Sequence, residues 1–211
     1  LVRSRGLGDV YKRQVICRLM TDRKPLPGKL AFSRDLFVLL FLLRGMPFVD
    51  LAFLRRCDLQ GNVITYHRRK TSRKLTVVVG KEAMEIIQKY MYAIPDSPYL
   101  FPIIQNPGKD EYGQYARMLR LQNYRLTQVA NILGIRDRLS TYTARHTWAT
   151  TALRQNYNSS LICDAMGHSS VKVTETYFQP YRDDEVNRMN SSLITYILSK
   201  KKRGTDKKIR S

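Results

Sequence analysis

The stretch GHSSVKVTETY, residues 167–177, places His168 nine residues before Tyr177, with small, hydroxylic and β-branched residues between them. Upstream, TYTARHTWAT at residues 141–150 places Tyr142 and Arg145 three positions apart, which puts both on one face of a helix. A tyrosine, a histidine and an arginine at such regular spacing point to chemistry as well as to packing.

Further basic residues lie toward the N-terminus. RRKTSRKL (68–75) carries Lys70, and LLRGMPFVDLAFL (42–54) carries Arg44 and Asp50. Breaking a phosphodiester without a metal requires a nucleophile, cations around the non-bridging oxygens and an acid for the leaving oxygen. Tyrosine can be the nucleophile, since nearby arginines favour its phenolate, and arginine meets phosphate oxygens with two hydrogen bonds. The residues therefore supply every part of such a site.

The hydrophobic pattern predicts an α+β fold that is mostly helical, with one small antiparallel β-hairpin. Residues 62–79 are rich in β-branched residues around KTS, which predicts the hairpin with Lys70 at its turn. Apolar residues at helical spacing and capping signals predict helices elsewhere. The expected helices cover residues 31–43, 48–56, 80–94, 114–134, 139–156, 159–166 and 183–198.

The charge of the chain favours a polyanionic partner. Lys and Arg number 37 against 17 Asp and Glu, which gives a formal net charge of +20. The three cysteines form no CxxC pair and have no neighbouring histidine at metal-ligand spacing, so we predict no structural metal. The longest apolar run, LFVLLFLL at 36–43, is far shorter than the roughly 20 residues that span a bilayer, and it predicts a buried helix.

The composition divides the chain into four segments. Residues 1–14 have no apolar periodicity and resemble non-native adapter sequence, so we exclude them from the fold. Residues 15–29, with two prolines and a glycine, are expected to be a linker. Residues 30–198 are expected to form one folded domain, and 199–211 a disordered basic tail.

Several motifs together resemble the tyrosine recombinases of the phage-integrase family, most closely the integrases of mobile elements. ARHTWAT (144–150) is similar to the second-arginine box of that family, and AMGHSSVKVTETY (165–177) to its histidine–tyrosine box. DLAFLRRCDL (50–59) resembles a third family segment. The resemblance covers roughly residues 25–195 and implies a set of catalytic residues: Tyr177, Arg145, His168, Lys70, Arg44 and Tyr142.

The resemblance implies a role for each position. Tyr177 would form a 3′-phosphotyrosine, arginines would clamp the phosphate, His168 would donate a hydrogen bond to it, and Lys70 would protonate the leaving 5′ oxygen. Two positions depart from the family pattern. Tyr142 stands where the family has histidine, and Pro47 stands where it has the first arginine, so Arg44 would take over that role from one helical turn earlier. Asp50 is expected to orient its neighbours.

The same resemblance implies that residues 30–198 are the catalytic domain and that residues 15–29 are the remnant of a missing N-terminal DNA-binding domain. It implies double-stranded DNA as partner, no metal or cofactor, and no membrane. It also implies a homotetramer on DNA that is assembled through the helix at 183–198, in the bacterial cytoplasm. A helix-turn-helix DNA-binding regulator without catalysis is the alternative, because LICDAMGHSSVKVTETY (161–177) and the segment 126–141 both have that pattern. Such a regulator would leave the Lys70 hairpin and RHTWAT without a role.

Overall fold

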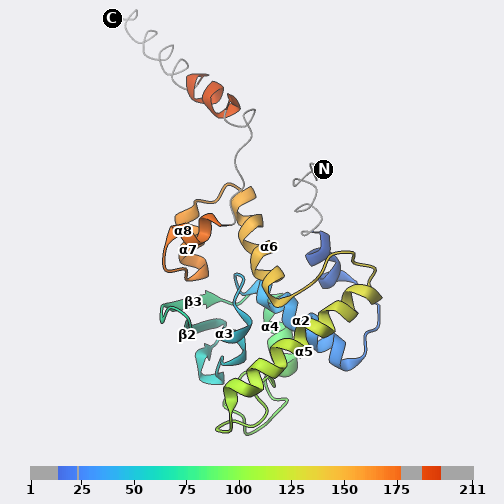
Figure 1. Ribbon diagram of the computed structural model, residues 1–211. Coiled ribbons are helices and arrows are strands. Elements are labelled where there is room, and N and C mark those ends of the chain that lie inside the picture. Colours follow the sequence, from blue (N-terminus) through green and yellow to red (C-terminus); the bar gives the residue numbers. More distant parts are fainter. Residues whose placement is uncertain (1–13, 23, 177–186, 196–211) are drawn as a thin grey trace, which may run out of the picture. The chain divides into compact units, whose positions relative to one another are not determined.

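The computed structural model describes residues 14–22, 24–176 and 187–195, and the chain divides into two units, Leu1–Tyr177 and Phe178–Ser211. The first unit is mostly helical with one small sheet, which confirms the predicted fold class (Figure 1). Its elements in chain order are α2 (Gly28–Leu42), α3 (Phe48–Ala52), η1 (Arg56–Asp58), β1 (Leu59–Gln60), β2 (Val63–His67), β3 (Lys74–Val78), α4 (Lys81–Tyr90), α5 (Glu111–Ile132), α6 (Thr141–Arg154), α7 (Ser159–Met166) and α8 (Val171–Glu175).

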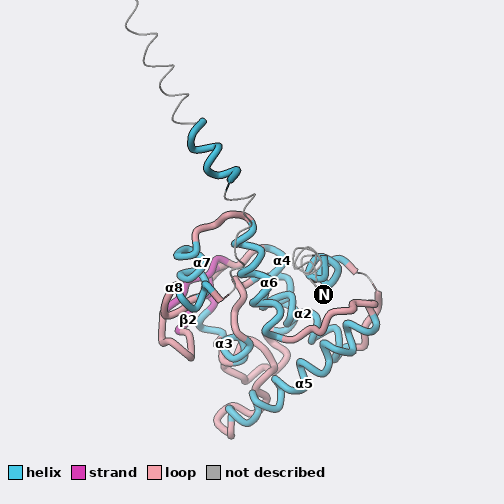
Figure 2. Tube along the Cα trace, turned by 45° about the horizontal axis from the view of Figure 1, so that its top comes forward, coloured by secondary structure: helices cyan, strands magenta, loops and turns pink. Residues whose placement is uncertain are grey.

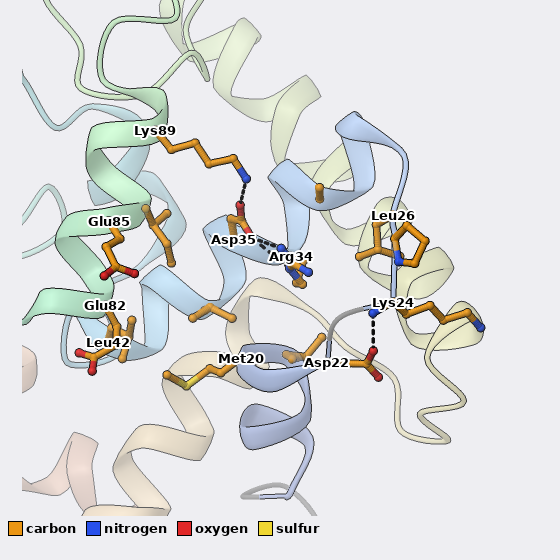
Figure 3. A pocket seen from close by; sticks show the side chains of 15 residues that line it. Met20, Asp22, Lys24, Leu26, Arg34, Asp35, Leu42, Glu82, Glu85 and Lys89 are labelled. Carbon is orange, nitrogen blue, oxygen red and sulfur yellow. Dashed lines mark hydrogen bonds and ion pairs between the residues drawn. The ribbon is translucent and has the colours of Figure 1, made fainter.

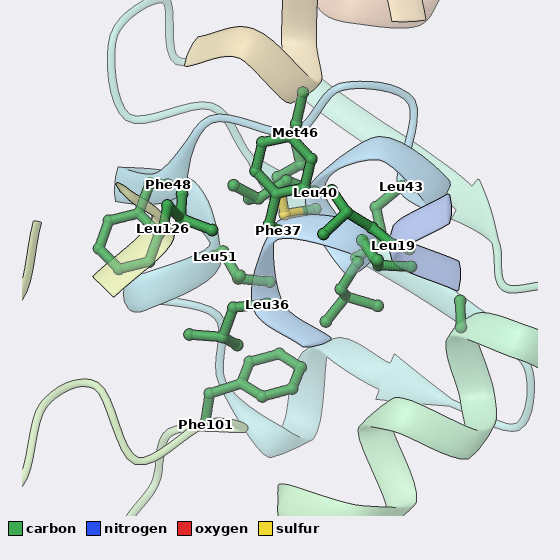
Figure 4. Close-up of a cluster of buried hydrophobic side chains, with 14 of the residues drawn as sticks. Leu19, Leu36, Phe37, Leu40, Leu43, Met46, Phe48, Leu51, Phe101 and Leu126 are labelled. Carbon is green, nitrogen blue, oxygen red and sulfur yellow. The ribbon is translucent and has the colours of Figure 1, made fainter. Parts of the chain in front are cut away.

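The centre of this unit is helix α2, which contacts α4, α5 and α6. Its apolar run at 36–43 forms the buried helix that the sequence predicts, and Leu36, Phe37, Leu39 and Leu40 are fully buried. Figure 4 shows the side chains of Leu36, Phe37 and Leu40 packed among those of the neighbouring segments. Because α2 is covered on several sides, its residues are apolar around much of the helix rather than along one stripe.

The sheet consists of three antiparallel strands in the order β1-β2-β3. The hairpin expected over residues 62–79 is present as β2 and β3, with Tyr66 opposite Leu75. On β2 the buried side chains of Ile64 and Tyr66 alternate with partly buried or exposed ones, as a half-buried strand requires. The two-residue strand β1 extends the sheet beyond the expectation. In both views, α7 and α8 lie beside this hairpin (Figures 1 and 2).

Part of the expected linker at 15–29 is folded. Residues 14–21 form a helix, and Val15, Ile16 and Leu19 are buried in the main core. These three side chains lie on one face of a short helix, so they pack together against the core. The expectations for residues 1–13 and 199–211 lie outside the described residues.

In the second unit, residues 187–195 form a helix, which agrees with the centre of the helix expected over 183–198; the remainder of that range lies outside the described residues. Three apolar side chains of this helix, Met189, Leu193 and Ile194, are each more than half exposed. Across the part of the chain that the structure describes, no helix is both long enough and apolar enough to cross a membrane.

Candidate active site

Arg145 is held inside the protein by helix α6. The helix begins at the N-cap Ser140, whose hydroxyl accepts a hydrogen bond from the Thr143 N–H while the Thr143 hydroxyl accepts one from the Ser140 N–H. One turn later the buried Arg145 side chain donates through Nη1 to the Gly45 carbonyl and through Nη2 to the Met166 carbonyl at 3.0 Å. The guanidinium therefore joins three segments that are far apart in the sequence.

His168 lies beside this guanidinium. Gly167 adopts a left-handed conformation that ends α7, and the chain turns there so that His168 is only 6 % exposed. Nη2 of Arg145 is 2.7 Å from Nε2 of His168, and Nδ1 of His168 is 2.8 Å from the hydroxyl of the buried Thr174. Because a guanidinium only donates, Nε2 is the acceptor, and the ring proton resides on Nδ1.

The imidazole of His168 is neutral at physiological pH. Burial lowers its pKa to about 4, and the positive charges of Arg145, Arg68 and Lys70 add to this effect. A neutral ring beside several cations is suited to exchanging hydrogen bonds with an anion rather than to carrying charge itself.

Asp50 and Arg68 form a buried ion pair under the site. Nε of Arg68 is 3.1 Å from one Asp50 oxygen, and the Arg69 N–H donates to the other oxygen at 3.0 Å. Burial raises the pKa of Asp50, while the Arg69 N–H and the Arg68 charge oppose that rise. Asp50 thus orients its neighbours, as the sequence analysis expected.

Arg44 contributes a third guanidinium. It has a positive φ of 60°, and its Nη1 donates to the Thr76 carbonyl on β3 at 3.2 Å. Burial and the charge of Asp50 raise the pKa of the Tyr66 phenol. Three guanidinium groups oppose that rise, namely those of Arg68, Arg145 and Arg44. All three therefore lie within electrostatic range of one buried ring, and Arg44 also precedes Gly45, whose carbonyl accepts from Arg145.

Lys70 lies exposed in the turn between β2 and β3, as the sequence predicts. Its charge is one of those that lower the pKa of His168, so the hairpin brings it within electrostatic range of that ring.

Tyr142 and Tyr177 are not part of the described cluster. Tyr142 is 59 % exposed in the first turn of α6, with its ring 6.2 Å from that of His146. Its side chain therefore lies at the surface, although it shares a helix with the buried Arg145. Tyr177 lies outside the described residues; Thr174, three positions earlier, is tied to His168.

The sequence analysis did not single out Arg68 or Thr174. Ile64, Tyr66 and Arg68 are buried at every second position, although Arg68 lies one residue beyond the end of β2. This period of two in the sequence could have predicted that Arg68 is buried. Apart from its place in the histidine–tyrosine segment, nothing in the sequence predicts that the Thr174 hydroxyl contacts His168.

A cavity of about 610 Å³ lies elsewhere, between the helix at 14–21, α2 and α4 (Figure 3). Its lining includes none of the candidate catalytic residues. Three of the charged groups at its wall are paired with one another, since Asp35 accepts hydrogen bonds from both Arg34 and Lys89. The cavity is therefore distinct from the cationic cluster.

The cluster around His168 has the composition of an anion site. The positive charges of Arg145, Arg68 and Lys70 act on His168, those of Arg68 and Arg145 act on the carboxylate of Asp50, and that of Arg44 acts with theirs on Tyr66. Partly desolvated guanidinium groups bind the oxygens of a phosphate diester strongly. Among the described residues, no group of three or more His, Cys, Asp or Glu side chains is arranged to hold a metal ion.

The profile of the phage integrase family matches residues 12–183. The tyrosine recombinase XerC of Thermodesulfovibrio yellowstonii is 26 % identical over 167 residues, which cover 72 % of this chain and 52 % of that protein. The chain thus spans about half the length of this curated relative.

Solved structures share the fold. The crystal structure of XerA recombinase matches with a TM-score of 0.58 at 19 % identity, over 87 % of this chain and 63 % of that one. The Tn1549 transposon integrase in complex with a circular intermediate DNA matches with a TM-score of 0.61 at 16 % identity, over 86 % and 63 %. These matches show that the described unit has the fold of a recombinase catalytic domain.

Proposed function

The chain belongs to the phage integrase family, and we propose that it is the catalytic domain of a site-specific DNA recombinase of a bacterial mobile element. The observation that carries this proposal is the contact of 2.7 Å between Arg145 and His168 within a buried cationic cluster. Both residues belong to motifs that resemble those of the family, and they lie 23 positions apart, Arg145 on α6 and His168 in the turn after α7. The bound substrate is double-stranded DNA, and the scissile phosphate occupies the cluster.

The reaction begins with Tyr177. After losing its proton to solvent, the phenolate oxygen attacks the scissile phosphorus, and the bond from phosphorus to the 5′ oxygen breaks. Negative charge builds on the non-bridging oxygens in the transition state, where Arg145 and Arg44 stabilise it. Lys70 gives a proton to the departing 5′ oxygen. A 5′-hydroxyl of a second strand then reverses these steps and rejoins the DNA, because the phosphotyrosine retains the phosphoester bond.

The hydrogen bonds of His168 determine how it meets the phosphate. In the absence of DNA, its Nε2 accepts from Arg145. A phosphate oxygen offers the guanidinium a stronger acceptor, so Arg145 turns its N–H groups to the phosphate. Nε2 is then released, and a shift of the ring proton from Nδ1 to Nε2 lets His168 donate to the same phosphate.

Arg44 takes the place of the first arginine of the family, and Tyr142 that of a histidine. The position of Arg44 beside Gly45, whose carbonyl binds Arg145, supports the first assignment. Tyr142, at the surface, donates a hydrogen bond to the DNA backbone rather than acting as a base.

The active assembly is a homotetramer on DNA in the bacterial cytoplasm. Strand exchange between two duplexes requires four cleavages. The exposed apolar residues Met189, Leu193 and Ile194 support the helix at 187–195 as the segment that joins the subunits. Leu193→Glu should prevent the assembly of four subunits on DNA, as measured by sedimentation of the complex.

Covalent trapping tests the proposed chemistry. The substrate is duplex DNA that spans the junctions flanking this reading frame, nicked beside the suspected crossover so that rejoining fails. Wild-type protein and Tyr177→Phe are incubated with it in the presence of EDTA and separated on a denaturing gel. We expect a protease-sensitive, slower band for the wild type alone.

Two other outcomes would contradict the proposal. If the wild type gives no band on DNA that it demonstrably binds, the helix-turn-helix regulator becomes the better explanation. If the band persists in Tyr177→Phe, a different residue is the nucleophile.

A further inference from the structure

The tip of the β2–β3 hairpin lies on the turn that carries His168. Nη1 of Arg68 donates to the Met166 carbonyl at 2.7 Å and to the Gly167 carbonyl at 3.1 Å. The Thr71 hydroxyl donates to the Gly167 carbonyl at 3.3 Å. The hairpin therefore holds successive carbonyls of a turn that lies almost one hundred residues further along the chain.

Arg73 adds two hydrogen bonds on the other side of the hairpin. Its Nη1 donates to the His168 carbonyl at 3.3 Å, and its Nη2 to a carboxylate oxygen of Asp164 at 2.9 Å. The contacts of Arg68, Thr71 and Arg73 span residues 164–168, so they fix the tip of the hairpin along its length rather than at one point.

The hairpin itself is closed around Lys70. The Arg68 N–H donates to the Arg73 carbonyl at 2.9 Å, and the Ser72 N–H donates to the Arg68 carbonyl at 2.8 Å. Arg68 is only 6 % exposed, and its ion pair with Asp50 anchors it. A buried guanidinium cannot leave its carboxylate without a large desolvation cost, so the base of the turn is fixed.

The backbone of the turn approaches the hairpin closely. A Cβ atom added at Gly167 would lie 2.7 Å from Cδ of Arg68 and 2.8 Å from Cδ1 of Leu75. Only a glycine allows this approach, and its φ of +63° is also one that other residues rarely adopt. The hairpin and the turn therefore behave as one packed unit.

The phosphate-binding cluster shares this unit. Nη1 of Arg68 and Nη2 of Arg145 both donate to the Met166 carbonyl. A displacement of the turn would therefore change the hairpin and the clamp together, whereas a loss of the contacts at Thr71 and Arg73 would release the hairpin alone.

We propose that Arg68, Thr71 and Arg73 are positioning residues that hold Lys70 at the reaction centre by docking its hairpin on the turn 164–168. This inference rests on the proposed function, in which Lys70 protonates the leaving oxygen. The docking sets the position of Lys70 before DNA binds. The same contacts do not position the phosphate-binding arginine Arg145 or the nucleophile Tyr177.

The test separates proton donation from the other steps. Cleavage is measured in single turnover on the nicked duplex described above, once with the natural 5′ oxygen and once with a 5′-bridging sulfur at the scissile bond. A thiolate leaves without a proton because thiols are much stronger acids than alcohols, so this substrate does not require a general acid. A defect limited to Lys70 or its position disappears on the sulfur substrate.

The principal variant combines Thr71→Val with Arg73→Gln, which removes the outer contacts and leaves the buried Arg68 in place. Lys74→Gln is the matched control, since it removes one positive charge from an exposed position of the same hairpin. Among the described residues, the Lys74 side chain makes no hydrogen bond or ion pair with the turn. Lys70→Ala is the reference for loss of the acid. Thermal melting and DNA affinity of each variant are compared with the wild type to detect a loss of folding.

On the oxygen substrate, Lys70→Ala should be slower by about a hundredfold or more and the double variant by about tenfold, in line with the usual contribution of a general acid. Both should return to within about threefold of the wild-type rate on the sulfur substrate. Lys74→Gln should match the wild type on both. Such a pattern supports the positioning role, since a residue that only stabilises the fold would slow both substrates equally.

Three results would overturn the inference. An equal slowing of the double variant on both substrates assigns the contacts to the clamp or the fold, and wild-type rates on both substrates remove any positioning role. If Lys70→Ala is not rescued by sulfur although the wild type forms its adduct, Lys70 is not the acid and the positioning role falls with it. A wild type that forms no adduct on either substrate is a distinct result, since it refutes the proposed function itself.

Discussion

Replacing His168 by Gln should remove a large part of the protein's loss of stability in mild acid. In the folded protein, burial and the charges of Arg145, Arg68 and Lys70 lower the pKa of His168 from its ordinary 6.5 to about 4. In the unfolded chain the ring regains its ordinary pKa. Between these two pH values the unfolded state binds a proton that the folded state does not, so stability falls as the pH falls from 6.5 to 4.

The magnitude follows from the gap between the two pKa values. A gap of this size corresponds to about 3 kcal/mol of unfolding free energy, accumulated between pH 6.5 and pH 4. Above this window neither state carries the proton, and below it both states do. The change of unfolding free energy with pH is therefore confined to this window. Gln has no proton to bind in this range, and its amide oxygen can still accept the hydrogen bond of Arg145.

The assay is urea unfolding without DNA, followed by the fluorescence of the single Trp148 on α6, at several pH values across this window. The difference in unfolding free energy between wild type and His168→Gln should shift by about 3 kcal/mol in favour of the variant as the pH falls. The exposed His67→Gln serves as control for the loss of an imidazole and should keep the wild-type profile. Parallel profiles for the wild type and His168→Gln would refute this account of the site's electrostatics.

Three further predictions concern the supports of the site and its substrate. Asp50→Asn leaves the buried charge of Arg68 without its carboxylate and should lower the unfolding free energy by about 3 kcal/mol in urea titrations; an unchanged midpoint would contradict the buried ion pair. Gly167→Ala should cost clearly more than Gly61→Ala, because both glycines have a positive φ but a Cβ meets atoms within 4 Å only at Gly167. Gly61→Ala should cost about 1 kcal/mol, and equal losses for the two variants would show that no close approach exists at Gly167. Affinity for duplex DNA, measured by fluorescence anisotropy, should fall by about a thousandfold between roughly 50 and 200 mM salt, and a flat profile would exclude phosphate contacts as the main source of binding.

The helices and the hairpin follow closely from local sequence. The apolar run at 36–43 predicts the buried α2, and the β-branched residues at 62–79 predict β2 and β3. These features are recognisable because periodicity and turn chemistry are local properties. The helix at 14–21 escapes the same reasoning, since three apolar residues become a buried face only when a core lies beside them.

The candidate site divides in the same way. The motif spacing identifies Arg145 and His168, and the predicted hairpin turn with the family resemblance identifies Lys70. The structure places the first two in contact and the third within electrostatic range of His168. The side chain of Tyr142 lies at the surface of α6.

By itself, the sequence determined the fold class, the basic character and the spacing of the residues that carry the chemistry, because these depend on residue type and on separations along the chain. Only the tertiary structure decided that Arg68 is buried against Asp50, that His168 is neutral with its proton on Nδ1, and that the hairpin of Lys70 rests on the turn at Gly167. Each of these depends on burial and on contacts between segments up to one hundred residues apart, and the free energy of a charge or a hydrogen bond is set by that environment rather than by its neighbours in the chain.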